Sequence, residues 1–144
     1  MTSITKKSPA PNDVLRIEKD GVTYALIFRR GLPVEDVRFV TDQTDGLQVG
    51  FFERKSGHAV PAHLHKPRTV DLPHIAEFLS IEKGEVRITV FDEKGKEIGE
   101  QSAHEGQCIL FLRGGHALTV IKDARIMEVK QGPYQPEDKI RLPA

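Results

Sequence analysis

The sequence predicts an all-β protein, a sandwich or closed barrel, on three observations. Short runs rich in valine, isoleucine, phenylalanine and threonine alternate with turns that contain glycine. Helical patterning is limited to a weak hint at residues 32–37. The length of 144 residues and the apolar content of 38% suit one globular domain with its own core.

The first half of the chain contains four expected strands. Residues 1–12 are polar with two prolines, and we expect them to form a flexible N-terminal arm. A strand over 22–28 follows the turn signal Lys19-Asp20-Gly21. Further strands are expected at 37–40, 47–53 and 58–65.

The second half predicts a continued meander of short strands. Residues 76–81 and 85–91 flank Glu82-Lys83-Gly84, which is typical of a hairpin turn. Later strands are expected at 107–112, 116–121 and 125–129. Residues 135–144 are charged, carry prolines near both ends, and are expected to form a tail.

Charge and cysteine content narrow the class of protein. The chain has 21 lysine and arginine residues and 21 aspartate and glutamate residues, so its formal net charge is zero. A nucleic-acid or membrane-surface role therefore gains no support. No apolar run has the length of a signal peptide core or a membrane span, so we expect a cytoplasmic protein. The single cysteine, Cys108, alternates with Leu110 and Leu112 and is expected to be a buried hydrophobe.

Histidines and one glutamate suggest a metal site. His63 and His65 are two residues apart, so on a strand they would share one face. Glu77 shares its parity with Leu79 and Ile81, and His116 shares its parity with Leu118 and Val120. A polar group among branched apolar residues is typical of one end of a barrel interior.

Three imidazoles and a carboxylate suit zinc, iron, manganese, nickel or copper better than calcium. The competing interpretations are two histidines on a surface strand, a salt-bridged strand glutamate and a turn histidine. His74, in the loop beside Pro73, is an alternative ligand to Glu77. We favour Glu77.

The spacing of these residues resembles the cupin superfamily. The first cupin motif is matched by Gly57, His63, His65, Glu77 and Gly84, with residues 66–76 standing between His65 and Glu77. The second motif is matched more loosely by Gly106, Leu112, Gly114 and His116. The sequence is most similar to a group of small single-domain bacterial cupins found with sugar and polysaccharide biosynthesis proteins. These proteins share the ending at residues 128–134.

The resemblance implies a double-stranded β-helix, the cupin jelly-roll barrel, over residues 13–134. It implies His63, His65, Glu77 and His116 as ligands of a divalent transition metal. It also implies a homodimer and a small-molecule ligand. Arg68, with Lys66 assisting, would hold an anionic end of that ligand near the barrel mouth. Solvated loop charges are the competing interpretation.

Three functions remain open from the sequence. The first is a metal-binding cupin that binds or acts on a small anionic or carbohydrate-derived ligand, as an oxygenase, isomerase or lyase if it is an enzyme. The second is a metal-independent sugar-nucleotide isomerase or epimerase with a histidine as general base. It is weakened because the chain has only two tyrosines to serve as an acid. The third is a non-catalytic small-molecule-binding module.

Overall fold

The structure is a computed structural model that describes residues 13–143, and it confirms an all-β chain. The regular elements are eight strands and one short 3-10 helix within the described residues. They are β1 (Val14–Lys19), β2 (Val22–Arg29), β3 (Val37–Phe39), β4 (Gly50–Phe52), β5 (Glu77–Phe91), β6 (Glu97–His104), β7 (Gln107–Phe111), β8 (Gly115–Lys130) and η1 (Pro136–Asp138).

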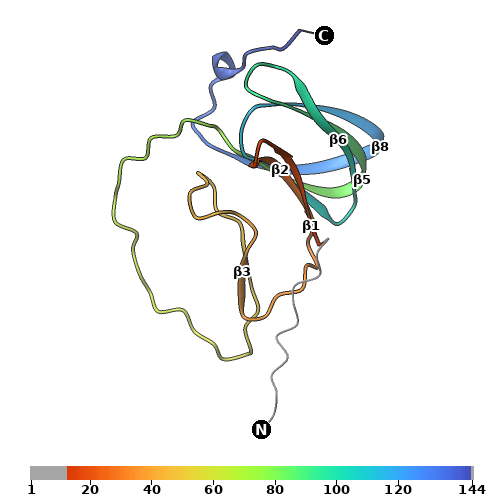
Figure 1. The fold of residues 1–144 in the computed structure, drawn as a ribbon. Helices are drawn as coiled ribbons and strands as arrows, with labels where there is room; N and C mark the ends of the chain where they lie inside the picture. The colour runs from red at the N-terminus through yellow and green to blue at the C-terminus, as the bar shows by residue number, and fades with distance from the viewer. Residues whose placement is uncertain (1–12, 144) are drawn as a thin grey trace.

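Six strands form one antiparallel sheet that curls into a half-barrel (Figure 1). The order is β1-β2-β7-β5-β6, and β8 pairs with β5. Strand β5 pairs with β7 along its first residues and with β6 along its second half. Strand β8 follows β5 along its other side over almost the whole length. The two long strands, β5 and β8, therefore form the spine of the half-barrel.

The curl is concentrated at Gly84 in the middle of β5. Pairing between β5 and β8 shifts register three times between Ile81 and Val86, and such bulges bend a strand and increase its twist. Gly84 has φ of +85°, and a Cβ atom there would lie 2.1 Å from the carbonyl oxygen of Asp123. Only glycine fits this bend, because a side chain would meet the neighbouring backbone.

The inner face of the half-barrel holds the larger apolar cluster. Alternate residues of β5, including Leu79, Ile81 and Ile88, point into it and are almost fully buried. The cluster continues on β2, β7 and β6 through Ile27, Ile109 and Ala103. The predicted inward parity of Glu77 with Leu79 and Ile81 therefore agrees with the burial of its two apolar companions.

The outer face packs against the small sheet of β3 and β4. Leu26, Phe28 and Leu110 belong to the opposite parity and form a second buried cluster with Val40. Phe51 of β4 meets Phe28 edge-on, with ring centroids 5.8 Å apart. Cys108 lies in this cluster, and burial raises the pKa of its thiol. The prediction of a buried cysteine is confirmed.

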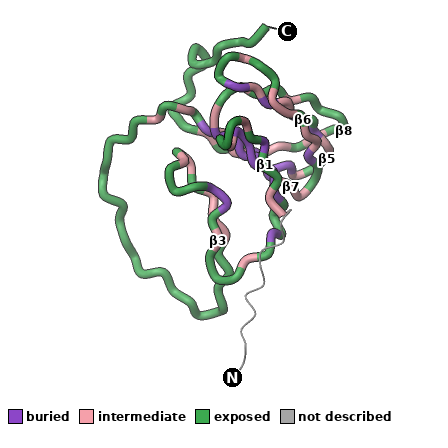
Figure 2. The backbone as a smooth tube through the Cα atoms, in the orientation of Figure 1, coloured by how far each residue is buried: buried purple, intermediate pink, exposed green. Residues whose placement is uncertain are grey.

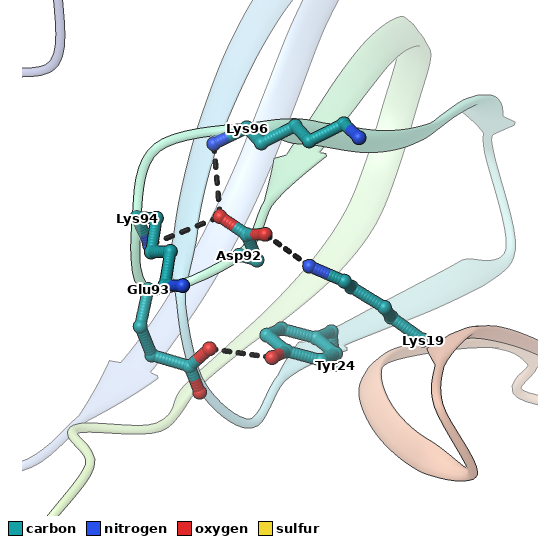
Figure 3. A network of polar contacts seen from close by, with 6 residues as sticks. All are labelled: Lys19, Tyr24, Asp92, Glu93, Lys94 and Lys96. Atoms are coloured by element: carbon teal, nitrogen blue, oxygen red, sulfur yellow. Dashed lines mark hydrogen bonds and ion pairs between the residues drawn. The ribbon is translucent and has the colours of Figure 1, made fainter.

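Polar contacts fasten the ends of the curled sheet (Figure 3). The Lys19 ammonium donates to the Asp92 carboxylate, whose other oxygen accepts the backbone N–H groups of Lys94 and Lys96 at 2.9 Å. The Tyr24 hydroxyl donates to Glu93 in the same turn. The Lys19 hydrogen bond and the two amides lower the pKa of Asp92 to about 2. These contacts tie β1 and β2 to the β5–β6 turn.

Residues 53–76, between β4 and β5, form a long extended loop that projects away from the sheet (Figure 1). We call this segment the arm. Every residue from 52 to 71 is exposed, as the uninterrupted green stretch in Figure 2 shows. Within the described chain, residues 59–75 make no backbone–backbone hydrogen bond.

Three expectations about the elements are wrong. Residues 58–65 form no strand in the described chain. Strands require a neighbour to satisfy their backbone groups, and Pro61, within this segment, has no amide to donate. Residues 82–84 form a bulge within one strand and not a hairpin turn. The sequence does not distinguish the two, because a glycine with positive φ suits both. Residues 32–37 form no helical turn.

Two strands, β1 and β6, were not expected from the sequence. The two strands expected at 116–121 and 125–129 are one continuous strand, β8.

Residues 1–12, expected to be a flexible N-terminal arm, lie outside the described residues. In the tail, Leu142 lies over Gly95 and Gly115, so residues 135–143 return toward the β5–β6 turn. In the described range, no helix has the length and apolarity that a bilayer crossing requires.

Candidate metal centre

Glu77 and His116 meet on the inner face of the half-barrel. Glu77 is the first residue of β5, while His116 pairs with Val90, close to the other end of that strand. A straight strand from Glu77 to Val90 would measure roughly 40 Å. Yet Glu77 Oε2 and His116 Nε2 lie only 2.7 Å apart. The curl at Gly84 therefore brings these two side chains together.

The surroundings of the pair hold it in place. The Phe111 ring lies parallel to the His116 imidazole, with centroids 3.9 Å apart and an interplanar angle of 6°. Phe111 is also the partner of Glu77 across β5 and β7, so one residue supports both groups. This stacking limits rotation of the imidazole and keeps its Nε2 directed at the carboxylate.

Electrostatics favour an ionised Glu77. The imidazole N–H of His116 donates a hydrogen bond that lowers the pKa of Glu77, and the positive charge of Lys130 acts in the same direction. Lys130 Nζ lies 3.8 Å from Glu77 Oε1 and 2.9 Å from Glu128 Oε1. Once an ion displaces the proton on Nε2, the Glu77 oxygen and the His116 nitrogen are two of the donors that a first-row metal ion uses.

His63 and His65 form a second pair, on the arm. Their ring centroids lie 5.1 Å apart, and Nδ1 of His63 lies 2.9 Å from the carbonyl oxygen of Pro61. If that nitrogen carries the proton, Nε2 remains as the coordinating atom. Both residues are exposed on the outward course of the arm. The chain thus presents two separate pairs of metal-type donors.

The four predicted ligands are not gathered in one place. Among the described residues, no three histidine, cysteine, aspartate or glutamate side chains converge as a metal site would require. The structure brings Glu77 to His116 and His63 to His65. His74, the alternative ligand, lines a small hollow with Gly46, Leu47, Leu72, Ala76 and Gln131.

The predicted ligand-binding cations, Lys66 and Arg68, also lie on the arm. Both are exposed, and neither makes an ion pair with another described residue. Sequence reasoning missed Phe111, although its alternation with Ile109 indicated an inward position. Nothing local to the sequence places Lys130 beside Glu77, although the two side chains lie 3.8 Å apart.

No protein-family model, curated protein or solved structure matches the chain.

Proposed function

We propose that this chain is a cupin-type metal-binding protein in which Glu77, His116, His63 and His65 hold one divalent transition ion. The observation that carries the proposal is the Glu77–His116 pair, 2.7 Å apart on the inner face and stacked on Phe111. A double-stranded β-helix would surround this pair with a complete barrel, and the curled half-barrel sheet supports that interpretation.

The donor set fits zinc, iron, manganese or nickel. Three imidazole nitrogens and one carboxylate oxygen leave one or two coordination positions for a ligand, unlike a closed structural site. Glu77 and His116 supply half of that set, and each is held by neighbours on the sheet. Such an ion would supply Lewis acidity to a bound small molecule.

The cations of the arm indicate what that small molecule carries. Lys66 and Arg68 follow His65 closely, so both would travel with the histidines to the metal site. A guanidinium binds carboxylate or phosphate through two parallel hydrogen bonds. We therefore propose an anionic or carbohydrate-derived ligand that bridges the ion and Arg68.

Metal content tests the proposal. Purified protein loaded with excess zinc, nickel or manganese and then desalted is expected to retain about one ion per chain by elemental analysis. The variants Glu77→Gln and His116→Ala are expected to lose it. His58→Ala, which removes an exposed histidine of the same arm, is the matched control and should retain the ion. Equal metal content in wild type, Glu77→Gln and His116→Ala would reject the proposal.

A further inference from the structure

Four polar side chains outside the candidate metal centre gather around the Glu93 carboxylate. The Tyr24 hydroxyl donates a hydrogen bond to Glu93 (Figure 3). This hydrogen bond lowers the pKa of Glu93, and the nearby His74 and Arg113 side chains act in the same direction. We call these residues, Tyr24, His74, Glu93 and Arg113, the Glu93 cluster. They come from β2, the end of the arm, the β5–β6 turn and the segment after β7.

The Glu93 cluster adjoins the candidate metal centre. Arg113 stands three residues before His116, and His74 stands three residues before Glu77. Phe111, the last residue of β7, pairs with Glu77, the first residue of β5. Because these strands are antiparallel, the segment after β7 and the segment before β5 leave the sheet at the same end. A small molecule bound at the Glu93 cluster would therefore lie near the Glu77–His116 pair.

Arg113 is the member of the cluster whose hydrogen-bonding groups are not used. Its Nε atom is shielded from solvent and has no hydrogen-bond partner among the described residues. Within residues 13–143, no carboxylate lies at ion-pair distance from its guanidinium. Shielding a charged donor from water without a partner opposes folding, so native proteins rarely do so. A cation held in this way indicates a place for an anion.

The backbone on both sides of Arg113 is fixed. The buried Leu112 donates its amide to a backbone carbonyl of β2 at 2.8 Å. Gly114 has φ of +70°, and a Cβ atom there would lie 2.2 Å from the carbonyl oxygen of Phe91. Arg113 therefore starts from a rigid point on the sheet, whereas Arg68 lies on the exposed arm. A donor that is already in position costs less conformational entropy when a ligand binds.

His74 provides a second donor and adjoins a hollow. The small hollow is lined by Gly46, Leu47, Leu72, His74, Ala76 and Gln131. A neutral imidazole carries one N–H donor in either tautomer. His74 therefore connects the Glu93 cluster to a hollow whose other walls are mostly small or apolar side chains.

The charge of Glu93 favours a carboxylate over a phosphate as the bound anion. Glu93 accepts the Tyr24 hydroxyl and lies near Arg113 without forming an ion pair with it. A carboxylate brings one negative charge to this place, whereas a phosphate monoester brings about 1.5–2 at pH 7. The repulsion from Glu93 is therefore larger for phosphate.

We propose that Arg113 and His74 form a carboxylate subsite beside the Glu77–His116 pair, and that a small organic acid binds there through its carboxylate. The inference deepens the proposed function, because it names the anionic group of the ligand. The closeness of that group to a metal ion rests on the proposed function. The binding of the carboxylate itself rests only on Arg113 and His74.

Titration of the metal-free, isotope-labelled protein with sodium acetate tests the subsite by NMR, at an ionic strength held constant with sodium chloride. Acetate is expected to shift the amide signals of residues 112–116 in a saturable way. Arg113→Gln is expected to weaken acetate binding about tenfold or more, because a hydrogen bond to a charged group is lost. Arg113→Lys keeps the charge but not the parallel donors, so its affinity should be intermediate.

Arg16→Gln is the matched control and should bind acetate as wild type does. Arg16 is an exposed arginine of β1 that forms no ion pair within the described part of the chain. Circular dichroism verifies that each variant keeps its β-structure. If Arg113→Gln does not fold, Arg113→Lys is compared with wild type in its place.

Three outcomes would overturn the subsite. The first is a wild type without a saturable acetate shift, and the second is an Arg113 variant that binds acetate as tightly as wild type, including the case in which only Arg68→Gln weakens binding. The third is inorganic phosphate that binds as tightly as acetate, since the carboxylate assignment would then be wrong. The titrated protein holds no metal, so none of these outcomes depends on the metal content that decides the proposed function.

Discussion

The half-barrel and the arm both contain β-branched residues, but these residues have different surroundings. In the half-barrel, strands such as β5 have a partner on both sides and bury alternate side chains. In the arm, residues of comparable β-propensity, such as Val60 and Val70, are exposed and unpaired in the described chain. The difference teaches that β-propensity describes a fit to a pleated neighbour and not a preference of the isolated backbone.

Hydrogen exchange gives the largest expected contrast between the two regions. Amides of β5 and β7 should exchange more slowly than those of residues 59–75 by a factor on the order of 10³ or more, because strand amides open only with the sheet. Mass spectrometry of exchanged peptides measures this. Equal protection of both regions would contradict the structure.

Gly84→Ala is expected to damage the half-barrel most among single substitutions. The left-handed conformation alone costs a non-glycine residue about 1–3 kcal/mol, and the new Cβ would also overlap the Asp123 carbonyl. Gly106→Ala is the control, since its φ of +86° is matched but nothing lies within 4 Å of the added atom. Urea unfolding compares the two. Equal losses of stability would show that the overlap is relieved without cost.

Arg38→Lys is expected to loosen the β3–β4 hairpin from the sheet. Arg38 binds Asp13 with two parallel hydrogen bonds of 2.6 and 2.9 Å, and these hold the pKa of the Asp13 carboxyl below its usual value. Lysine cannot reproduce both bonds, so unfolding should become easier by about 1–2 kcal/mol.

Arg54→Lys is the control for that pair, because its partner Asp36 is largely exposed. An exposed ion pair contributes about 0–1 kcal/mol. If Arg54→Lys lost as much stability as Arg38→Lys, the two parallel hydrogen bonds between Arg38 and Asp13 would not have the role given to them here. Chemical denaturation monitored by tyrosine fluorescence or circular dichroism measures both variants.

The smallest expected effect depends on pH and concerns Asp92. Its pKa is lowered to about 2 from 3.8, so folding favours the ionised carboxylate. The stabilisation is present above about pH 4 and is lost as the pH falls from 3.8 toward 2. Asp92→Asn should therefore have a lower free energy of unfolding than wild type at pH 7. The difference between the two proteins should decrease in this acid range. A difference in free energy of unfolding that stays constant from pH 7 to pH 2 would contradict the lowered pKa of Asp92.

The sequence by itself determined the local properties of this protein. Short β-rich runs separated by glycine turns predicted the all-β class. Alternation predicted the buried Cys108 and the inward parity that Glu77 shares with Leu79 and Ile81, because side-chain direction on a strand follows from period two alone. The hairpin predicted at residues 82–84 was wrong, because glycine serves a turn and a bulge equally and only the partner strand distinguishes them.

Only the tertiary structure decided which distant residues meet. The curl at Gly84 brings His116 to Glu77 and places Phe111 and Lys130 around them, although these residues belong to three strands. It also decided that residues 58–65 have no partner strand in the described chain. The physical reason is that pairing and burial depend on non-local backbone neighbours, which local residue patterns do not specify.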